Sequence, residues 1–127
     1  MHSGDRRLPL AIATVVLGVS HLAAWAAQPD ASARTEIAYL LTFVKTSACQ
    51  FNRNGSWHPS TEAAAHIERK YEYVLGKGMV ATAEDFIRLA ATQSSYSGTA
   101  YTVKCDGNVL KSADWLTQAL HLFRKQH

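Results

Sequence analysis

The uncharged segment from Leu8 to Ala27 constrains the chain most, because it decides which residues fold and in which compartment they do so. It follows a short stretch that carries Arg6 and Arg7, and it ends in small residues. A basic start, an apolar stretch and a small-residue exit are typical of a secretory signal peptide. Signal peptidase requires small side chains at the third and first positions before the cut, which favours cleavage between Ala26 and Ala27.

An uncleaved membrane anchor is the alternative, since about 20 uncharged residues can span a bilayer. Gly18 and His21 weaken such a helix, and cleavage is therefore favoured. We expect three parts: a signal peptide over residues 1–26, a mobile leader over 27–33 and a single mainly helical domain over 34–127. The processed protein is expected to be periplasmic or secreted, with no attachment to the membrane.

The composition excludes several classes of protein. The chain has 127 residues, of which 47% are hydrophobic and 18% charged, and this balance argues against a disordered or low-complexity chain. The formal net charge is +3, and removal of the signal peptide leaves the remainder only mildly basic. Because no run of consecutive Arg and Lys residues is longer than the two at Arg6-Arg7, we expect no nucleic-acid partner.

The two cysteines, Cys49 and Cys105, both lie in the part that is expected to be exported. Two cysteines in an exported chain of this size are typical of one disulfide, because that compartment is oxidising. A bridge across so long a loop stabilises the fold by about 4 kcal/mol in the chain-entropy model. Redox chemistry by two free thiols is less favoured, because the C-x-x-C spacing is missing.

Apolar residues recur with helical spacing in four stretches of the chain. Thr82, followed by an acid at Asp85, indicates the N-cap of the third helix. The predicted helices run over residues 35–48, from Ser60 to Gly76, from Thr82 to about Ser94, and from an N-cap at Ser112 to about Phe123.

A β-hairpin is predicted before the last helix, because Asp106-Gly107 lies between two short runs over residues 101–105 and 108–110. The sequence shows no evident internal repeat. The expected fold is therefore mostly α, with about four helices, a short β-hairpin before the last helix and one disulfide.

A series of short motifs extends from about residue 36 to residue 124. They are Cys49-x-Phe51-x-Arg53-Asn54-Gly55, Glu62-Ala63-Ala64-x-His66, Lys70-Tyr71, Glu84-Asp85-Phe86-Ile87, Ser94-Ser95-x-Ser97-Gly98-x-x-Tyr101-x-Val103-x-Cys105 and Trp115-Leu116. Their order and spacing resemble the small exported bacterial family known as domain of unknown function 5329. The resemblance implies a Gram-negative envelope setting, but it supplies no activity and no catalytic residue.

The segment over residues 51–58 is the strongest candidate for a binding site. It places Arg53, Trp57 and His58 around an Asn-Gly turn, so that a guanidinium able to pair with a carboxylate or phosphate lies beside a ring that can stack. The favoured alternative is a tight turn whose aromatic residues only attach it to the core. The candidate binding residues are Arg53, Asn54, Trp57, His58 and His66.

His58, Glu62 and His66 are spaced by four, as zinc ligands on one helix would be. Pro59 marks the start of that helix, however, and places His58 outside it, so we expect no metal. The usual nucleophile motifs of serine hydrolases are missing, and we expect no catalytic residue and no cofactor. The segment over residues 97–101 reads S-G-x-x-Y, which is similar to a loop motif of periplasmic inhibitors of C-type lysozyme.

The favoured function is a non-enzymatic binding or interaction protein of the cell envelope. Its partner would be another envelope protein or a wall-derived ligand. Small size, export, a disulfide and the lack of a recognisable catalytic set motivate this hypothesis. Two alternatives stay open: a small metal-dependent or hydrolytic envelope enzyme that uses His58, Glu62 and His66, and a periplasmic protein similar to the lysozyme inhibitors.

Overall fold

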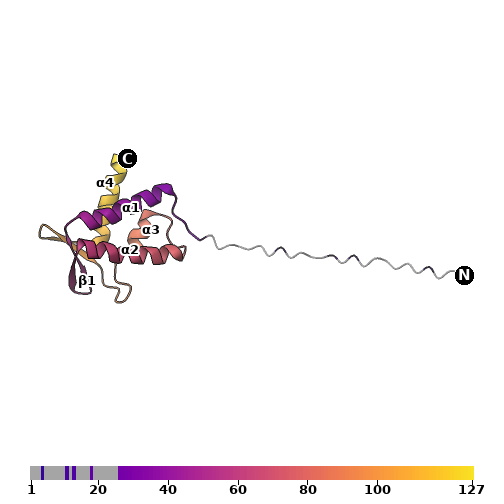
Figure 1. Cartoon of the computed structure of the whole chain (residues 1–127), viewed down its shortest axis with the longest axis horizontal. Helices are drawn as coiled ribbons and strands as arrows, with labels where there is room; N and C mark the ends of the chain where they lie inside the picture. The colour runs from indigo at the N-terminus through magenta and orange to yellow at the C-terminus, as the bar shows by residue number, and fades with distance from the viewer. Residues whose placement is uncertain (1–3, 5–10, 12, 14–17, 19–25) are drawn as a thin grey trace.

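The computed structural model describes residues 26–127 and, before them, residues 4, 11, 13 and 18 (Figure 1). The predicted signal peptide falls almost entirely outside the described residues and stays a prediction. Over residues 26–127 the chain forms four helices and four strands. In chain order they are α1 (Ala31–Thr46), β1 (Gln50–Arg53), β2 (Ser56–Pro59), α2 (Ser60–Gly76), α3 (Ala83–Ala90), β3 (Thr102–Cys105), β4 (Asn108–Lys111) and α4 (Ser112–Gln126).

Local capping chemistry sets where two of the helices begin. The Thr82 hydroxyl accepts a hydrogen bond from the Asp85 N–H at 3.1 Å, which confirms the predicted N-cap of α3. Helix α1 begins earlier than predicted, because the Asp30 carboxylate accepts from the Ala33 N–H at 2.8 Å. In the predicted leader, the Ala27 N–H donates to a backbone carbonyl at 2.8 Å, and the mobility of that leader stays a prediction.

Buried side chains from all four helices form one core. Helices α1 and α2 lie side by side (Figure 1), α3 packs against both, and α4 packs against α1 and α3. None of the helices in the described part of the chain is long and apolar enough to cross a membrane. The largest side chains that are fully buried belong to Phe86, Ile37, Leu40, Leu116, Leu120, Val44, Val80 and Val103.

The strands form one antiparallel sheet in the order β2-β1-β3-β4, so the prediction of a mostly α fold with one short hairpin was wrong. The additional hairpin is β1–β2, which turns at Asn54 and Gly55. Both residues have positive φ, 52° and 84°, as the type I′ turn of a two-residue hairpin requires. Its strands carry one aromatic residue each, Phe51 and Trp57, so no apolar alternation marks them in the sequence.

The two hairpin–helix units, β1-β2-α2 and β3-β4-α4, repeat one arrangement. Gly55 and Gly107 hold the same turn position, and Ser60 and Ser112 begin the two helices at the same distance from it. Strands β1 and β3 are antiparallel neighbours with Phe51 opposite Val103. An approximate two-fold axis through that residue pair therefore relates the two units. This relation is not evident in the sequence, because the two units share few residue types beyond the turn glycines and the serines.

One face of the sheet packs against the helices and is here called the inner face. On this face the two-fold axis divides the β1–β3 pair into two matching halves, called the two sides. Continuing the β1–β3 register by one residue at each end places Cys49 opposite Cys105 and Arg53 opposite Tyr101. These four residues lie on the same face as the pair on the axis, because side chains alternate along a strand. The two-fold relation exchanges the cysteine pair with the Arg53–Tyr101 pair.

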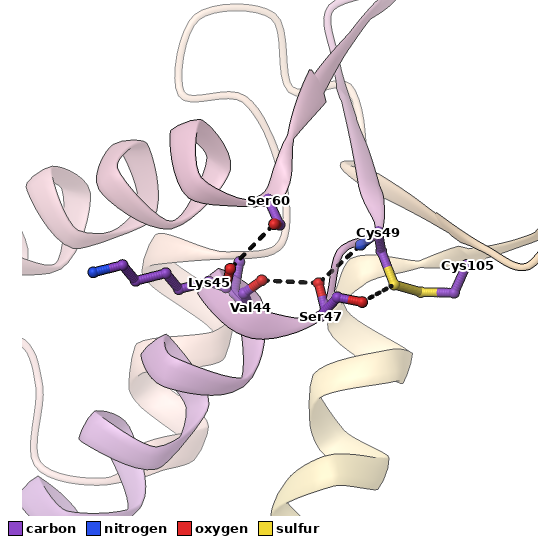
Figure 2. The surroundings of a disulfide bond; sticks show 6 residues. All are labelled: Val44, Lys45, Ser47, Cys49, Ser60 and Cys105. Carbon is purple, nitrogen blue, oxygen red and sulfur yellow. Dashed lines mark hydrogen bonds between the residues drawn. A yellow bond between two sulfur atoms is a disulfide. The ribbon is translucent and has the colours of Figure 1, made fainter.

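The predicted disulfide between Cys49 and Cys105 is confirmed (Figure 2). It joins the residue before β1 to the last residue of β3, with 4.8 Å between the two Cα atoms. Beside it, the Ser60 hydroxyl donates to the Lys45 carbonyl oxygen at 3.1 Å, which ties the start of α2 to the end of α1 (Figure 2). This side of the axis is thus closed by one covalent bond and one satisfied hydroxyl.

Candidate functional site

A pocket lies on the other side of the two-fold axis, between the inner face of the sheet and α2. Its cavity volume, counted as space for the centre of a water molecule, is about 50 Å³. One water needs about 10–15 Å³ by this measure, so the pocket has room for a few waters or for one small polar group. It is lined by Phe51, Asn52, Arg53, His58, Glu62, Ala63, His66, Ile67, Arg69, Tyr101 and Ser112.

Sheet register brings three of the lining residues into one row. Arg53 ends β1 and lies opposite Tyr101, and the β3–β4 register continues to place Tyr101 opposite Ser112. The Ser112 N–H donates to the Tyr101 carbonyl oxygen at 2.9 Å, which fixes this end of the row. The three side chains therefore share the inner face, although Arg53 and Ser112 are 59 positions apart in the sequence.

A chain of hydrogen bonds connects this row to α2. Arg53 Nη1 lies 2.6 Å from His66 Nδ1, and His66 Nε2 lies 3.2 Å from Tyr101 Oη. Arginine can only donate, so His66 accepts at Nδ1 and carries its proton on Nε2. Lys70 Nζ also donates to Tyr101 Oη, at 3.1 Å, and to the Gln93 carbonyl oxygen, at 2.7 Å.

The electrostatics of the cluster keep the imidazole neutral. Burial, followed by the charges of Arg53 and Lys70, lowers the pKa of His66 to about 4. Burial also lowers the pKa of Lys70, with Arg53 adding to the effect, and burial raises the pKa of Tyr101. At neutral pH the cluster therefore presents a neutral imidazole and a protonated phenol beside two cations.

The structure brings together three of the five predicted binding residues. Arg53, His58 and His66 all line the pocket. His58 Nδ1 lies 3.0 Å from Glu62 Oε1, and that carboxylate is 56% exposed at the mouth. Whether these residues bind a ligand stays a prediction.

The other two predicted residues, Asn54 and Trp57, lie away from the pocket. Trp57 is on the outer face of the sheet, where Lys104 Nζ lies 4.4 Å from its ring centroid. Asn54 is at the hairpin tip and accepts a hydrogen bond from the Ser97 hydroxyl at 2.6 Å. Trp57 is separated from its neighbour His58 because consecutive side chains on a strand point to opposite faces.

The zinc arrangement considered for His58, Glu62 and His66 does not form. His66 is turned toward Arg53, and a guanidinium at 2.6 Å from Nδ1 repels any cation at that nitrogen. In the part of the chain that the structure describes, no group of three His, Cys, Asp or Glu residues is placed to hold a metal ion.

Four residues of the site were not predicted from the sequence: Tyr101, Ser112, Arg69 and Lys70. It assigned Ser112 to a helix start and Tyr101 to a strand and to the S-G-x-x-Y motif. Tyr101 is only 5% exposed, so its ring lies inside the fold and is not presented on an open loop. The available signal was the repeated pattern of an Asn-Gly or Asp-Gly turn followed by Ser60 or Ser112.

Comparison with known proteins gives one match. The model of a family of unknown function, DUF5329, matches residues 31–124, which covers all the elements that build the pocket. No curated protein and no solved structure matches the chain.

Proposed function

We propose that this chain, which belongs to the DUF5329 family, is a non-enzymatic binding protein of the cell envelope. The observation that carries the proposal is the pocket between β1 and α2, where Arg53, Tyr101 and Ser112 converge from both hairpin–helix units. Residues so distant in sequence meet there around a cavity large enough for one polar group. The ligand would be a wall-derived molecule or part of another envelope protein.

The hydrogen-bond arrangement favours binding over proton-transfer catalysis. His66 accepts from Arg53 at one nitrogen and contacts Tyr101 at the other, so both ring nitrogens already have protein partners. A pKa of about 4 keeps His66 in its neutral form at neutral pH, so it has no imidazolium proton to give as a general acid. The cluster is therefore better suited to holding a group in place than to moving protons.

Export is part of the same proposal. The signal-like segment before Ala27 and the Cys49–Cys105 disulfide both support an oxidising compartment. We expect the processed chain, beginning at Ala27, in an osmotic-shock extract of the cells that produce it. Recovery of only the unprocessed chain in the membrane fraction would contradict this part.

A native mass spectrum tests the binding proposal. The protein would be purified from the osmotic-shock extract of its own cells without reducing agent, as the native chain and as the Ala63→Trp variant. Ala63 lines the pocket, and a tryptophan there would fill it. We expect the native chain to carry an additional mass that Ala63→Trp lacks. Trp57→Ala, on the outer face of the sheet, is the control and should keep that mass.

Two results would contradict the proposal. One is a bare native chain whose spectrum matches that of Ala63→Trp. The other is an additional mass that survives the filling of the pocket, since it would place the ligand elsewhere on the molecule.

A further inference from the structure

Ser112 differs from its two-fold equivalent, Ser60, in one informative way. Both serines are the first residue of a helix that follows a hairpin. Ser60 donates its hydroxyl hydrogen to the Lys45 carbonyl oxygen at 3.1 Å. The Ser112 side chain is fully buried against the pocket, and among the described residues its hydroxyl has no hydrogen-bond partner. A buried hydroxyl without a partner is costly, so a ligand group that entered the pocket and reached this hydroxyl would relieve that cost.

Tyr101, next to Ser112 in the row, offers a second hydroxyl hydrogen. Tyr101 Oη accepts from the Nε2–H of His66 and from Lys70 Nζ, at 3.2 and 3.1 Å. These two donors occupy the acceptor positions of the phenol oxygen, so its own hydrogen has to point to a different acceptor. His66 and Lys70 thereby orient the Tyr101 hydroxyl as a donor.

The charges around these hydroxyls select the sign of the ligand. Arg53 and Arg69 line the pocket, and Lys70 reaches its Tyr101 wall. Glu62 is the acidic residue in the lining, and its carboxylate is bonded to His58 at the exposed mouth. Two hydroxyl donors beside guanidinium groups form the environment that a carboxylate or phosphate group requires.

We infer that the pocket binds one oxyanion, a carboxylate or phosphate group at the end of a larger ligand. Arg53 supplies the charge, and the hydroxyls of Tyr101 and Ser112 donate to the anionic oxygens. A cavity of about 50 Å³ holds only this group, so the rest of the ligand lies outside the pocket mouth. This inference rests on the proposed function and names the chemical class of the ligand.

Titration with inorganic phosphate and, separately, with acetate tests the inference on the full processed chain. Binding would be followed by amide chemical shifts and by the melting temperature, each against sodium chloride at equal ionic strength. We expect one of the two anions to shift the resonances of Tyr101 and Ser112 in a saturable way that chloride does not reproduce. The anion that binds then identifies the group that the ligand carries: phosphate indicates a phosphate group, and acetate indicates a carboxylate.

Ser112→Ala and Ser60→Ala form the matched pair for this titration. A hydrogen bond to a charged group is worth enough that Ser112→Ala should weaken anion binding about tenfold or more. Ser60→Ala, whose hydroxyl lies on the disulfide side, should leave the affinity unchanged.

Saturable binding that both serine variants retain in full would overturn the assignment of the Ser112 hydroxyl. If neither anion binds more than chloride does, while the native chain still carries a mass that Ala63→Trp lacks, the oxyanion class is wrong and the binding function stands. If that mass is missing as well, both proposals fail.

Discussion

The two sides of the approximate two-fold axis use the same backbone for different purposes. On one side, Cys49 and Cys105 lie opposite each other and form the disulfide. On the other side, Arg53 and Tyr101 hold the matching positions and belong to a hydrogen-bonded cluster with His66. A cross-link therefore stabilises one side of the sheet, and the same place on the other side presents polar groups to a cavity.

Helices α2 and α4, which follow the two hairpins, also differ at a matching position. Trp115 in α4 holds the position that Ala63 holds in α2, counted from the start of each helix. The Trp115 ring packs on Phe51 and Phe43, with centroid distances of 5.5 and 4.5 Å. Ala63 is too small to reach across, and the pocket lies beneath it. The pocket therefore exists because one side has a small residue and a polar pair where the other has a large residue and a disulfide.

Removal of the disulfide is expected to have the largest effect on stability. Cys49→Ser with Cys105→Ser releases a constraint across 56 residues of sequence, which should lower the free energy of unfolding by about 4 kcal/mol. Urea unfolding under oxidising conditions measures the loss, with the reduced native chain as the control. A loss below about 1 kcal/mol would show that this side does not depend on its cross-link.

Trp115→Ala should have the next largest effect, about 3 kcal/mol, because truncation of a packed tryptophan removes contacts and leaves a cavity. Urea unfolding of the disulfide-bonded variant measures it. If the two sides are equivalent, the variant should also acquire a second cavity above the disulfide, which would be visible in a crystal structure. Unchanged stability would contradict the packing role given to this ring.

The third prediction converts the polar side into a copy of the cross-linked side. Arg53→Cys with Tyr101→Cys places two thiols where the two-fold relation puts the equivalents of Cys49 and Cys105. We expect a second disulfide to form, detected as four hydrogens lost from the fully reduced mass. The gain in stability should be smaller than the loss in the first prediction, because the cluster with His66 is removed. Two free thiols in the folded variant would contradict the equivalence.

Local chemistry explains which parts of the fold could be predicted from the sequence. The N-cap at Thr82 and the turn at Asp106-Gly107 depend on a few adjacent residues, and both were found. The turn at Asn54-Gly55 was also recognised, but not the strands around it. Strand β1 joins the rest of the sheet by pairing with β3, a contact across about 50 residues of sequence that no local pattern reports.

The site was predicted to the extent that it depends on neighbouring residues. Arg53 and His66 were both identified, because a turn followed by a helix brings them near each other. Trp57 was grouped with them but lies on the outer face of the sheet, because its direction follows from a strand that had not been recognised. Tyr101 and Ser112 were missed, because only the sheet register carries them across the axis to Arg53.

The pH dependence of stability should also distinguish the two sides, because only the polar side contains His66. The pKa of His66 is about 4 in the folded protein and about 6.5 when unfolded, so the unfolded chain binds more protons between these values. The contribution of His66 to the free energy of unfolding is therefore fully present above about pH 6.5 and should fall as the pH drops toward 4. His66→Gln, which copies Gln118 at the matching position of α4, should flatten this part of the profile. An unchanged slope in His66→Gln would assign the proton uptake to another group.

The smallest expected difference is the most direct test of the comparison, because it uses the same substitution on each side. Ser60→Ala removes a donor to the Lys45 carbonyl oxygen and should lower the free energy of unfolding by about 1 kcal/mol. Ser112→Ala removes a buried hydroxyl that has no partner among the described residues, so it should change stability by less than about 0.5 kcal/mol or raise it. Both serines begin a helix, so the higher helix propensity of alanine contributes equally to the two variants and cancels in their difference. Urea unfolding in a buffer without phosphate or carboxylate measures both. Equal losses would mean that Ser112 is already satisfied without a ligand, and the two sides would then differ in shape alone.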